Sequence, residues 1–419
     1  MRLQLSGPPS NLLNASIKIT GSKSESNRLL LLQALYPEIS IKNISNSDDA
    51  GVMQKGRSIS NGEVDIHHAG TAMRFLTGYF ASQEGKEVIL TGSPRMQERP
   101  IKVLVEALQD LGAQISYQNK QGYPPLHIKG RKISKHKVRL PANVSSQYIS
   151  ALLLIAPSLE NGLELELVGE ITSVPYIKMT LELLRQLGIE NTFQGNLIKV
   201  QPKEKIAPIT MVVESDWSSV SYFYSILALA EVGSKIVVSS YKKNSLQGDS
   251  VLADIYTQFG VITHFEDHQL VLEKTSMPEH REFSKEKNTH MEFHLANAPD
   301  IAQTIAVTCF GLGLGCHLTG LHTLKIKETD RLEALKTELT KLGAAINVTD
   351  KDLTLEPMSI INYGIQIETY NDHRMAMAFA PLALRTTLII NDAGVVSKSY
   401  PDFWKDLGAL KIKMTSLQS

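Results

Sequence analysis

Residues 105–117, VEALQDLGAQISY, join an amphipathic helical pattern to a glycine and then to a short run typical of a β-strand. The same order returns at 181–193 (LELLRQLGIENTF), 253–265 (ADIYTQFGVITHF), 335–348 (LKTELTKLGAAINV) and, more weakly, 403–414 (FWKDLGALKIKM). The glycines of these segments are 65 to 83 residues apart: Gly112, Gly188, Gly260, Gly343 and Gly408. This period is too long for a solenoid and favours a repeated α/β unit of several elements. Such joints also occur without repeats, so a non-repetitive α/β fold stays open.

The length and charge of the chain limit its class. With 419 residues, of which 42% are hydrophobic, the chain can bury a large core, and two or three domains are expected. Lys and Arg number 43, and Asp and Glu also number 43, so the net charge is zero and indicates neither a nucleic acid nor a membrane surface as partner. Any anionic ligand must therefore be bound by local clusters of cations.

The cysteines and the apolar runs indicate a cytosolic protein. Cys309 and Cys316 cannot form a disulfide framework, and no metal-binding Cys/His spacing occurs, which fits a reducing compartment. The first residues show no basic segment followed by an apolar stretch, so we expect no signal peptide. The longest uncharged run, 301–324, is broken by glycines and polar residues and predicts a buried helix and strand, not a membrane span.

Cationic and small polar residues cluster at the starts of strongly apolar helical segments. A helix N-terminus carries about half a positive charge, so a cation there costs a few tenths of a kcal/mol unless an anion lies between them. A solvated helix end would explain any one segment, but six in one chain indicate ligands with several negative charges. The residues are Lys23, Ser24 and Arg28 (in 21–35), Arg74 (68–76), Arg95 and Arg99 (94–108), Lys327 and Arg331 (325–335), His373 and Arg374 (370–384), and Lys398 (395–404).

Two acidic residues lie within this basic setting. Asp300 precedes a charge-free apolar helix, and Glu328 lies between Lys327 and Arg331. A carboxylate among cations stays ionised and can accept a proton from a hydroxyl. A helix N-cap at Asp300 and a surface ion pair between Glu328 and Arg331 are equally open.

Neutral donors open another helical segment at 145–147, Ser-Ser-Gln. These side chains would orient a ligand where more charge is unwanted, or the serines would simply cap the helix. Ser173 and Tyr176 are, by themselves, typical of a turn.

Six motifs together closely resemble the 5-enolpyruvylshikimate-3-phosphate synthases, also called 3-phosphoshikimate 1-carboxyvinyltransferases. They are, in the family's order, GSKSESNR (21–28), AGTAMR (69–74), PRMQERP (94–100), VSSQYISALL (144–153), KETDRL (327–332) and YNDHRMAM (370–377). This family transfers the enolpyruvyl group of phosphoenolpyruvate to the 5-hydroxyl of shikimate-3-phosphate and releases phosphate, on the route to chorismate and the aromatic amino acids. The resemblance implies this activity, these two small-molecule substrates, no metal or other cofactor, and inhibition by glyphosate.

The resemblance also implies a role for each matching residue. Those that match phosphoenolpyruvate contacts are Lys23, Gly70, Thr71, Arg99, Gln147, Arg331, Arg374 and Lys398. Those that match shikimate-3-phosphate contacts are Ser24, Arg28, Ser145, Ser146, Gln147, Ser173, Tyr176, Asp300, Thr323 and Lys327. Asp300 and Glu328 match the catalytic carboxylates and His373 an active-site histidine, while Lys23 or Glu328 would donate a proton.

The fold that the resemblance implies is α/β, a two-domain inverse α/β barrel in which each domain holds three βαβαββ units. Residues 1–20 and 214–419 are expected to form one discontinuous domain, with the phosphoenolpyruvate-side carboxylates and the C-terminal cations. Residues 21–213 would form the inserted domain on the shikimate-3-phosphate side. The segment after Asp49 is about two dozen residues short, so one unit is expected to lack a helix and a strand.

Three positions depart from the family pattern. His68 stands where the family usually has asparagine, Phe75 where it has proline, and Thr323 where it often has asparagine. Because that proline lies on the helix that begins at Gly70, Phe75 implies different packing there and weaker binding of glyphosate.

Two other functions stay open. The enolpyruvyl transferase that acts on UDP-N-acetylglucosamine shares the fold, but its usual Lys-Asn pair is Lys23-Ser24 here, and its loop cysteine is absent from 94–100. A phosphosugar-binding protein could also keep the pocket and lose turnover. For the favoured function we expect a cytoplasmic monomer that binds neither nucleic acid nor a membrane.

Overall fold

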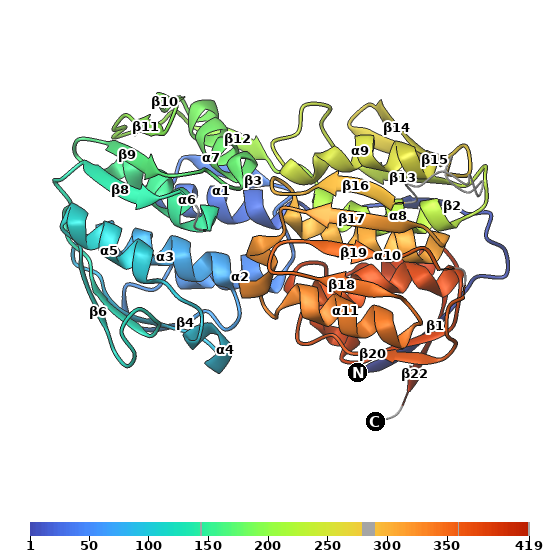
Figure 1. Cartoon of the computed structure of the whole chain (residues 1–419). Coiled ribbons are helices and arrows are strands. Elements are labelled where there is room, and N and C mark those ends of the chain that lie inside the picture. The colour runs from blue at the N-terminus through green and yellow to red at the C-terminus, as the bar shows by residue number, and fades with distance from the viewer. Residues whose placement is uncertain (143–144, 279–289, 359, 418–419) are drawn as a thin grey trace. The chain divides into compact units, whose positions relative to one another are not determined.

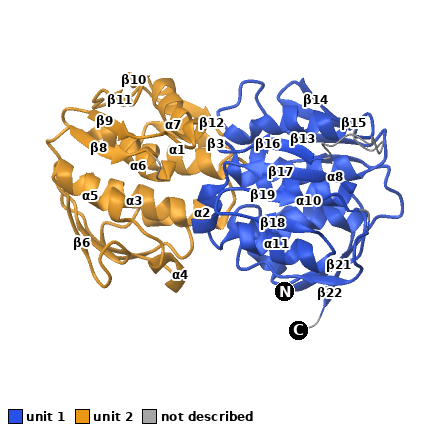
Figure 2. Cartoon of the chain, viewed as in Figure 1, with its two compact units in different colours: residues 1–20, 214–419 blue, residues 21–213 orange. Residues whose placement is uncertain are grey.

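The computed structural model describes residues 1–142, 145–278, 290–358 and 360–417. The chain divides into two compact units, coloured separately in Figure 2: Met1–Thr20 with Glu214–Ser419, and Gly21–Val213. Both units are built from α/β repeats, whose helices and strands are labelled in Figure 1.

Two complete βαβαββ repeats make up most of the unit 21–213. In each, the first two strands are parallel, and the last two form an antiparallel hairpin that completes a four-stranded sheet. The first repeat comprises β4 (Asn61–Asp65), α3 (Gly70–Ser82), β5 (Glu87–Thr91), the short α4 (Pro94–Gln97), α5 (Lys102–Leu111), β6 (Gln114–Tyr117) and β7 (Leu126–Lys129). The second comprises β8 (Lys137–Pro141), α6 (Ser146–Ile155), β9 (Leu163–Val168), α7 (Val174–Gln186), β10 (Asn191–Gln194) and β11 (Leu197–Val200).

The third repeat of this unit is shortened. Its sheet has only two strands, β12 (Ile209–Val212) parallel to β3 (Ile39–Lys42), with the helices α1 (Lys23–Leu35) and α2 (Asp48–Gly56). The helix after residue 47 is therefore present, and the expectation that a helix and a strand would be missing was wrong about the helix. Compared with the other repeats, this repeat lacks the closing pair of strands.

The unit formed by 1–20 and 214–419 holds three four-stranded repeats. The first has β2 (Asn14–Ile17), α8 (Trp217–Leu229), β13 (Lys235–Ser239), α9 (Leu252–Ile255), β14 (Val261–Glu266) and β15 (Gln269–Lys274). The second has β16 (His290–His294), α10 (Ala302–Leu312), β17 (Gly315–Thr319), α11 (Arg331–Lys341), β18 (Ile346–Val348) and β19 (Leu353–Leu355). The third has β20 (Ile365–Ile367), α12 (His373–Phe379), β21 (Leu388–Ile390), α13 (Phe403–Ala409), β22 (Lys413–Leu417) and, paired with β22, the N-terminal strand β1 (Arg2–Ser6).

Helices form the interior of this unit and sheets its outside. Every residue of α10 and α12 is buried, and α10 packs against α8 and α12. A helix that is apolar on all sides must be surrounded by protein. Strands such as β16 instead alternate buried and exposed residues, which is typical of a sheet with one solvated face. The expected inverse α/β barrel is thereby confirmed.

The run 301–324 was correctly predicted as a buried helix and strand, since it contains α10 and β17. Within the described residues, no helix is both long enough and apolar enough to span a membrane. Cys309 and Cys316 are both buried and free.

Four of the five predicted helix–glycine–strand joints occur as expected. The residues Gly112, Gly188, Gly260 and Gly343 follow helical turns with positive φ values between 74° and 108° and lead into strands. The fifth prediction was wrong, because Gly408 lies inside α13. The left-handed residue after that helix is Lys411, with a φ of 62°.

Candidate active site

Arg331 gathers three carboxylates in the unit formed by 1–20 and 214–419. It is the first residue of α11, and its side chain is 2% exposed. Its guanidinium donates from Nε to Asp372 Oδ2 (2.6 Å), from Nη1 to Asp300 Oδ1 (2.9 Å) and from Nη2 to Glu328 Oε2 (2.8 Å). Burial by itself would lower the pKa of Arg331, but the three carboxylates outweigh burial and raise it. The Glu328–Arg331 pair is thus part of a buried network, not a surface ion pair.

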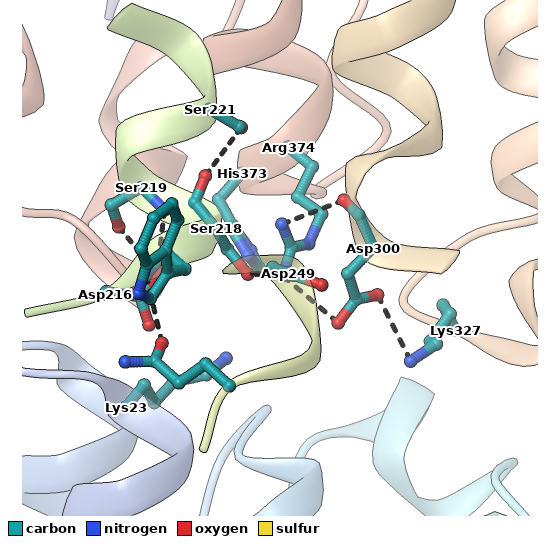
Figure 3. Close-up of polar contacts among 12 residues, drawn as sticks. Lys23, Asp216, Ser218, Ser219, Ser221, Asp249, Asp300, Lys327, His373 and Arg374 are labelled. Atoms are coloured by element: carbon teal, nitrogen blue, oxygen red, sulfur yellow. Dashed lines mark hydrogen bonds and ion pairs between the residues drawn. The ribbon is translucent and has the colours of Figure 1, made fainter. Parts of the chain in front are cut away.

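Asp300 lies among three cations. It belongs to the 3-10 helix η5 (Pro299–Ile301), and neither η5 nor the following α10 has a side-chain cap, so the N-cap alternative does not hold. Besides Arg331, Lys327 Nζ lies 3.4 Å from Asp300 Oδ1 and Arg374 Nη2 lies 3.1 Å from Asp300 Oδ2 (Figure 3). These cations favour the ionised carboxylate, which can accept a proton from a hydroxyl.

The start of α12 supplies two further expected residues. Its N-cap, Asp372, is fully buried and accepts a hydrogen bond from the backbone N–H of Arg374 (2.9 Å). The Arg374 side chain donates from Nη1 to the carbonyl oxygen of Asp300 (3.0 Å) and from Nη2 to Ser218 Oγ (3.2 Å). His373 is buried beside it, with Nδ1 3.9 Å from Asp372 Oδ1.

Two expected residues lie beside this cluster. Lys398 Nζ donates to the carbonyl oxygen of Asn371 (2.5 Å), just before α12. Lys398 ends the 3-10 helix η8 (Ala393–Lys398), and α13 begins only at Phe403, so the prediction that this lysine marks the start of an apolar helix was wrong. Thr323 lies in η6 (His322–Ile326), and its buried hydroxyl has no hydrogen-bond partner in the part of the chain that the structure describes.

In the unit 21–213, α1 carries three of the expected residues. Lys23 is its first residue, after the N-cap Ser22, and Lys23 Nζ lies 3.1 Å from Asp49 Oδ2 at the start of α2. Ser24 is half-buried, and its carbonyl oxygen accepts a hydrogen bond from Arg28 Nη1 (2.8 Å). The first two turns of α1 therefore hold one ammonium group and one guanidinium group.

The Arg28 guanidinium is buried, and its hydrogen bonds go to neutral acceptors. Nε donates to Thr180 Oγ1 (2.8 Å), and Nη2 donates to Ser150 Oγ (3.0 Å) and to the carbonyl oxygen of Tyr176 (3.3 Å). Burial lowers the pKa of Arg28 to about 10, so the group stays charged at neutral pH. Its charge is not balanced by a bonded carboxylate among the described residues, which leaves it to attract an anionic ligand.

Four expected residues meet where α3 and α6 begin. A Cβ on Gly70 would lie 2.5 Å from Arg99 Nη1, so the guanidinium of Arg99 lies directly against the first residue of α3. Gln147 Nε2, from α6, donates to Thr71 Oγ1 (3.2 Å) on α3. This arrangement presents a guanidinium, a hydroxyl and an amide beside a helix N-terminus, a combination that suits a phosphate or a carboxylate.

Two other cations of this unit, Arg74 and Arg95, differ in burial. Arg74 is buried and donates to the carbonyl oxygens of Gly70 (3.2 Å) and Pro100 (3.1 Å), which fixes the segment next to Arg99. Arg95 forms an ion pair with Glu98 (2.9 Å) in which both side chains are exposed.

The remaining expected residues lie at two helix starts. Ser145 caps α6 by accepting the backbone N–H of Gln147 (3.4 Å), and Ser146 is buried as the first residue of α6. Ser173 precedes α7 with a φ of 56°, a left-handed conformation that is uncommon for serine and that clusters at functional sites. The ring of Tyr176, on α7, has its centroid 5.9 Å from Arg28 Cζ.

Sequence reasoning did not assign a role to three residues of these clusters: Asp49, Ser218 and Asp372. Asp372 carries the usual sequence signal of an N-cap, an aspartate just before an apolar helix. Its ion pair with Arg331, 41 residues earlier in the chain, has no sequence signal. Only the fold brings these two groups together.

A family model described as EPSP synthase (3-phosphoshikimate 1-carboxyvinyltransferase) matches residues 51–407. The chain belongs to the EPSP synthase family. The matched residues include Asp300, Glu328 and His373. The α1 motif, 21–28, precedes the matched range.

Sequence relatives of this chain extend over nearly its whole length. The 3-phosphoshikimate 1-carboxyvinyltransferase of Bacteroides fragilis strain YCH46 is 44% identical over 414 residues, which cover 97% of each chain. The enzyme of the same name from Pasteurella multocida is 35% identical over 94% of this chain and 95% of its own.

Two solved structures share the fold. EPSP synthase from Acinetobacter baumannii matches 99% of this chain and all of its own, with a TM-score of 0.79 and 20% identity. The enolpyruvyl transferase NikO from Streptomyces tendae matches 99% of this chain and 98% of its own, with a TM-score of 0.71 and 13% identity. At these identities the likeness concerns the fold alone, and it agrees with the inverse α/β barrel described above.

Proposed function

We propose that this chain transfers the enolpyruvyl group of phosphoenolpyruvate to the 5-hydroxyl of shikimate-3-phosphate, with release of phosphate, in the biosynthesis of aromatic amino acids. Membership of the EPSP synthase family supports this activity. The position of Asp300 assigns this activity to a site: its ionised carboxylate lies within 3.4 Å of three cations. Such a site can hold a base next to anionic substrates.

The reaction proceeds by addition and elimination. A proton donor, Lys23 or Glu328, protonates the methylene carbon of phosphoenolpyruvate, and the 5-hydroxyl oxygen attacks the resulting cationic carbon while Asp300 accepts its proton. This forms a tetrahedral adduct in which the carbon bears both the new ether oxygen and the phosphate. Loss of a methyl proton and of phosphate then restores the double bond and gives the enolpyruvyl ether. Cations around the leaving phosphate stabilise the charge that develops on it.

The anionic substrates are assigned to the two sets of cations described above. Gly70, Thr71, Arg99 and Gln147 offer one anion site in the unit 21–213, and Lys327, Arg374 and Lys398 lie around Asp300 and the start of α12 in the other unit. Arg28 attracts shikimate-3-phosphate, because it is buried and bonded to neutral groups only. Arg331, bonded to three carboxylates, acts chiefly by holding Asp300 and Glu328 in place.

Release of inorganic phosphate tests this proposal and its two alternatives. Purified protein treated with a chelator is mixed with phosphoenolpyruvate and either shikimate-3-phosphate or UDP-N-acetylglucosamine. Phosphate release with the first acceptor alone is expected. Release with the second acceptor alone would assign the chain to the other enolpyruvyl transferase, and release with neither would favour a binding protein. The cytoplasmic location, the monomeric state and the independence of metal stay predictions.

A further inference from the structure

Asp249 is a buried carboxylate next to the proposed active-site groups. It lies in the 3-10 helix η2 (Gly248–Val251) and is 3% exposed. Its Oδ2 accepts a hydrogen bond from the hydroxyl of Ser218, in the first turn of α8. Its Oδ1 is also buried and has no hydrogen-bond partner among the described residues. Burying a carboxylate with one oxygen unsatisfied is costly, so such a group calls for an explanation.

The charged groups that face Asp249 are of both signs. Burial is the main cause that raises its pKa, to about 6, and the negative charges of Asp300 and Asp216 raise it further. Arg374 and the hydrogen bond from Ser218 act in the opposite direction. With a pKa of about 6, both forms of this carboxyl group are populated slightly below neutral pH.

Ser218 connects Asp249 to Arg374 (Figure 3). The Oγ of Ser218 accepts a hydrogen bond from Arg374 Nη2 (3.2 Å) while it donates its own proton to Asp249 Oδ2. The same Nη2 lies 3.1 Å from Asp300 Oδ2. Arg374 is therefore held between Asp300 on one side and the Ser218–Asp249 pair on the other.

The protonation state of Asp249 decides how Ser218 is oriented. A hydroxyl has one proton to donate. While Asp249 is ionised, that proton points to the carboxylate, and the lone pairs of Ser218 remain turned toward Arg374. Once Asp249 is protonated, it can itself donate to Ser218 Oγ. The proton of Ser218 then turns away from Asp249, and the negative charge that attracts the Arg374 guanidinium is lost.

We propose that Asp249 is a positioning residue for the transferase reaction: its carboxylate, through Ser218, holds Arg374 against Asp300, and protonation of Asp249 releases that hold. This inference rests on the proposed function, because the proposed function gives Arg374 its role toward phosphoenolpyruvate and Asp300 its role toward the 5-hydroxyl. The inference adds a pH dependence to these two roles. The value of kcat/KM for phosphoenolpyruvate falls as the pH is lowered through about 6.

The test compares the pH profiles of matched variants between pH 5 and 9. Asp249→Asn should lower kcat/KM for phosphoenolpyruvate about tenfold at pH 8, the scale of one hydrogen bond to a charged group, and should remove the acidic limb. Its KM for shikimate-3-phosphate should change little. Ser218→Ala should lower kcat/KM for phosphoenolpyruvate by the same factor. Ser218→Thr keeps the hydroxyl and should retain most of the wild-type value. The double variant, Asp249→Asn with Ser218→Ala, should lose no more than either single variant. Asp254→Asn, an exposed neighbour on α9, is the control and should match the wild type.

A second measurement does not depend on turnover. Carbon-13 NMR of protein labelled at the aspartate carboxyl carbons, with Asp249→Asn to assign the signal, should show Asp249 titrating near pH 6, and Ser218→Ala should raise that value. A titration near pH 4, or an acidic limb unchanged in Asp249→Asn, would overturn the inference. Absence of turnover in the wild type with a titration near pH 6 would count against the proposed function instead.

Discussion

The guanidinium carbon of Arg28 lies 5.4 Å from the centroid of the Phe75 ring. Both side chains are buried, one on α1 and the other on α3. The family resemblance led us to expect a proline at this position, and in this chain the Phe75 ring lies against the Arg28 guanidinium instead. A desolvated cation–π contact is worth about 2 kcal/mol, and it helps to hold a guanidinium that lacks a carboxylate partner among the described residues.

Loss of the Phe75 ring should weaken the binding of shikimate-3-phosphate. We expect Phe75→Leu to raise KM for this substrate roughly three- to thirtyfold, the scale of one cation–π contact, with a smaller change in kcat. Phe75→Tyr keeps the ring and should stay close to the wild type. Phe80→Leu removes a buried ring of the same helix whose cation contact is with Lys86 and not with Arg28, so it controls for the loss of a buried ring. Equal KM values in the two leucine variants would assign Phe75 to packing alone.

A methyl group at Gly70 should displace Arg99. The added Cβ would lie 2.5 Å from Nη1, the far end of a flexible side chain, so the guanidinium should move while the fold survives. We expect Gly70→Ala to raise KM for phosphoenolpyruvate at least tenfold and to leave the melting temperature nearly unchanged. Gly51→Ala, in α2, meets nothing within 4 Å and should leave KM unchanged and stabilise the helix slightly. Similar KM values in both variants would show that Arg99 does not bind this substrate.

Removal of the proposed base should abolish most turnover. We expect Asp300→Asn to lower kcat about a hundredfold or more, as is usual when a general base is lost, with less effect on the binding of shikimate-3-phosphate. Asp350→Asn removes a carboxylate from an exposed ion pair with Lys325 and should have no effect on kcat. Near-normal kcat in Asp300→Asn would show that another group accepts the proton.

Asp372 should matter for stability more than the other carboxylates around Arg331. It is fully buried and bonds to two nitrogens of the guanidinium, Nε and Nη2. Removing one partner of a buried ion pair typically costs about 3–5 kcal/mol of unfolding free energy. We therefore expect Asp372→Asn to unfold at clearly lower urea concentration than the wild type. Asp330→Asn, which keeps an N-cap at α11, should lose about 1 kcal/mol at most; equal losses in both would contradict the assigned role.

The buried carboxyl of Asp249 should make stability depend on pH. Because its pKa is raised from 3.8 to about 6 in the folded protein, its contribution is favourable below pH 4 and is lost as the pH rises through 6. At pH 8 the ionised group costs about 3 kcal/mol relative to a neutral one. Asp249→Asn should therefore melt at a higher temperature than the wild type at pH 8, and the difference should shrink toward pH 4. A wild type that is the more stable protein at pH 8 would contradict this account.

The repeat was predictable because most units contain a glycine between a helix and a strand, which is a local signal in the sequence. A left-handed residue after a helix favours glycine, so Gly112 and Gly343 reveal where one helix ends and a strand begins. The last joint was mispredicted, because Gly408 lies within α13 and Lys411 adopts the left-handed conformation instead. The shortened unit was also only partly predicted, since length shows that residues are missing but not which element they formed.

The charged groups of the site were predictable from the motifs, but most of their contacts were not. Lys23, Asp300 and Arg331 each stand in a recognisable pattern. The contacts of Asp300 with Arg374, and those of Asp249 with Ser218, join residues 74 and 31 positions apart in the chain. Such pairs depend on how helices pack, and a single sequence carries no signal for them.

The measurement that tests the central claim most directly is proton and phosphorus NMR of the reaction itself. Purified protein in a chelating buffer is mixed with equal amounts of phosphoenolpyruvate and shikimate-3-phosphate, and Asp300→Asn is run beside it. We expect the vinyl proton signals of phosphoenolpyruvate to be replaced by those of an enolpyruvyl ether while one equivalent of inorganic phosphate appears, at a rate at least a hundredfold lower in the variant. Unchanged spectra with the wild-type protein, or ether formation only with UDP-N-acetylglucosamine, would contradict the proposed function.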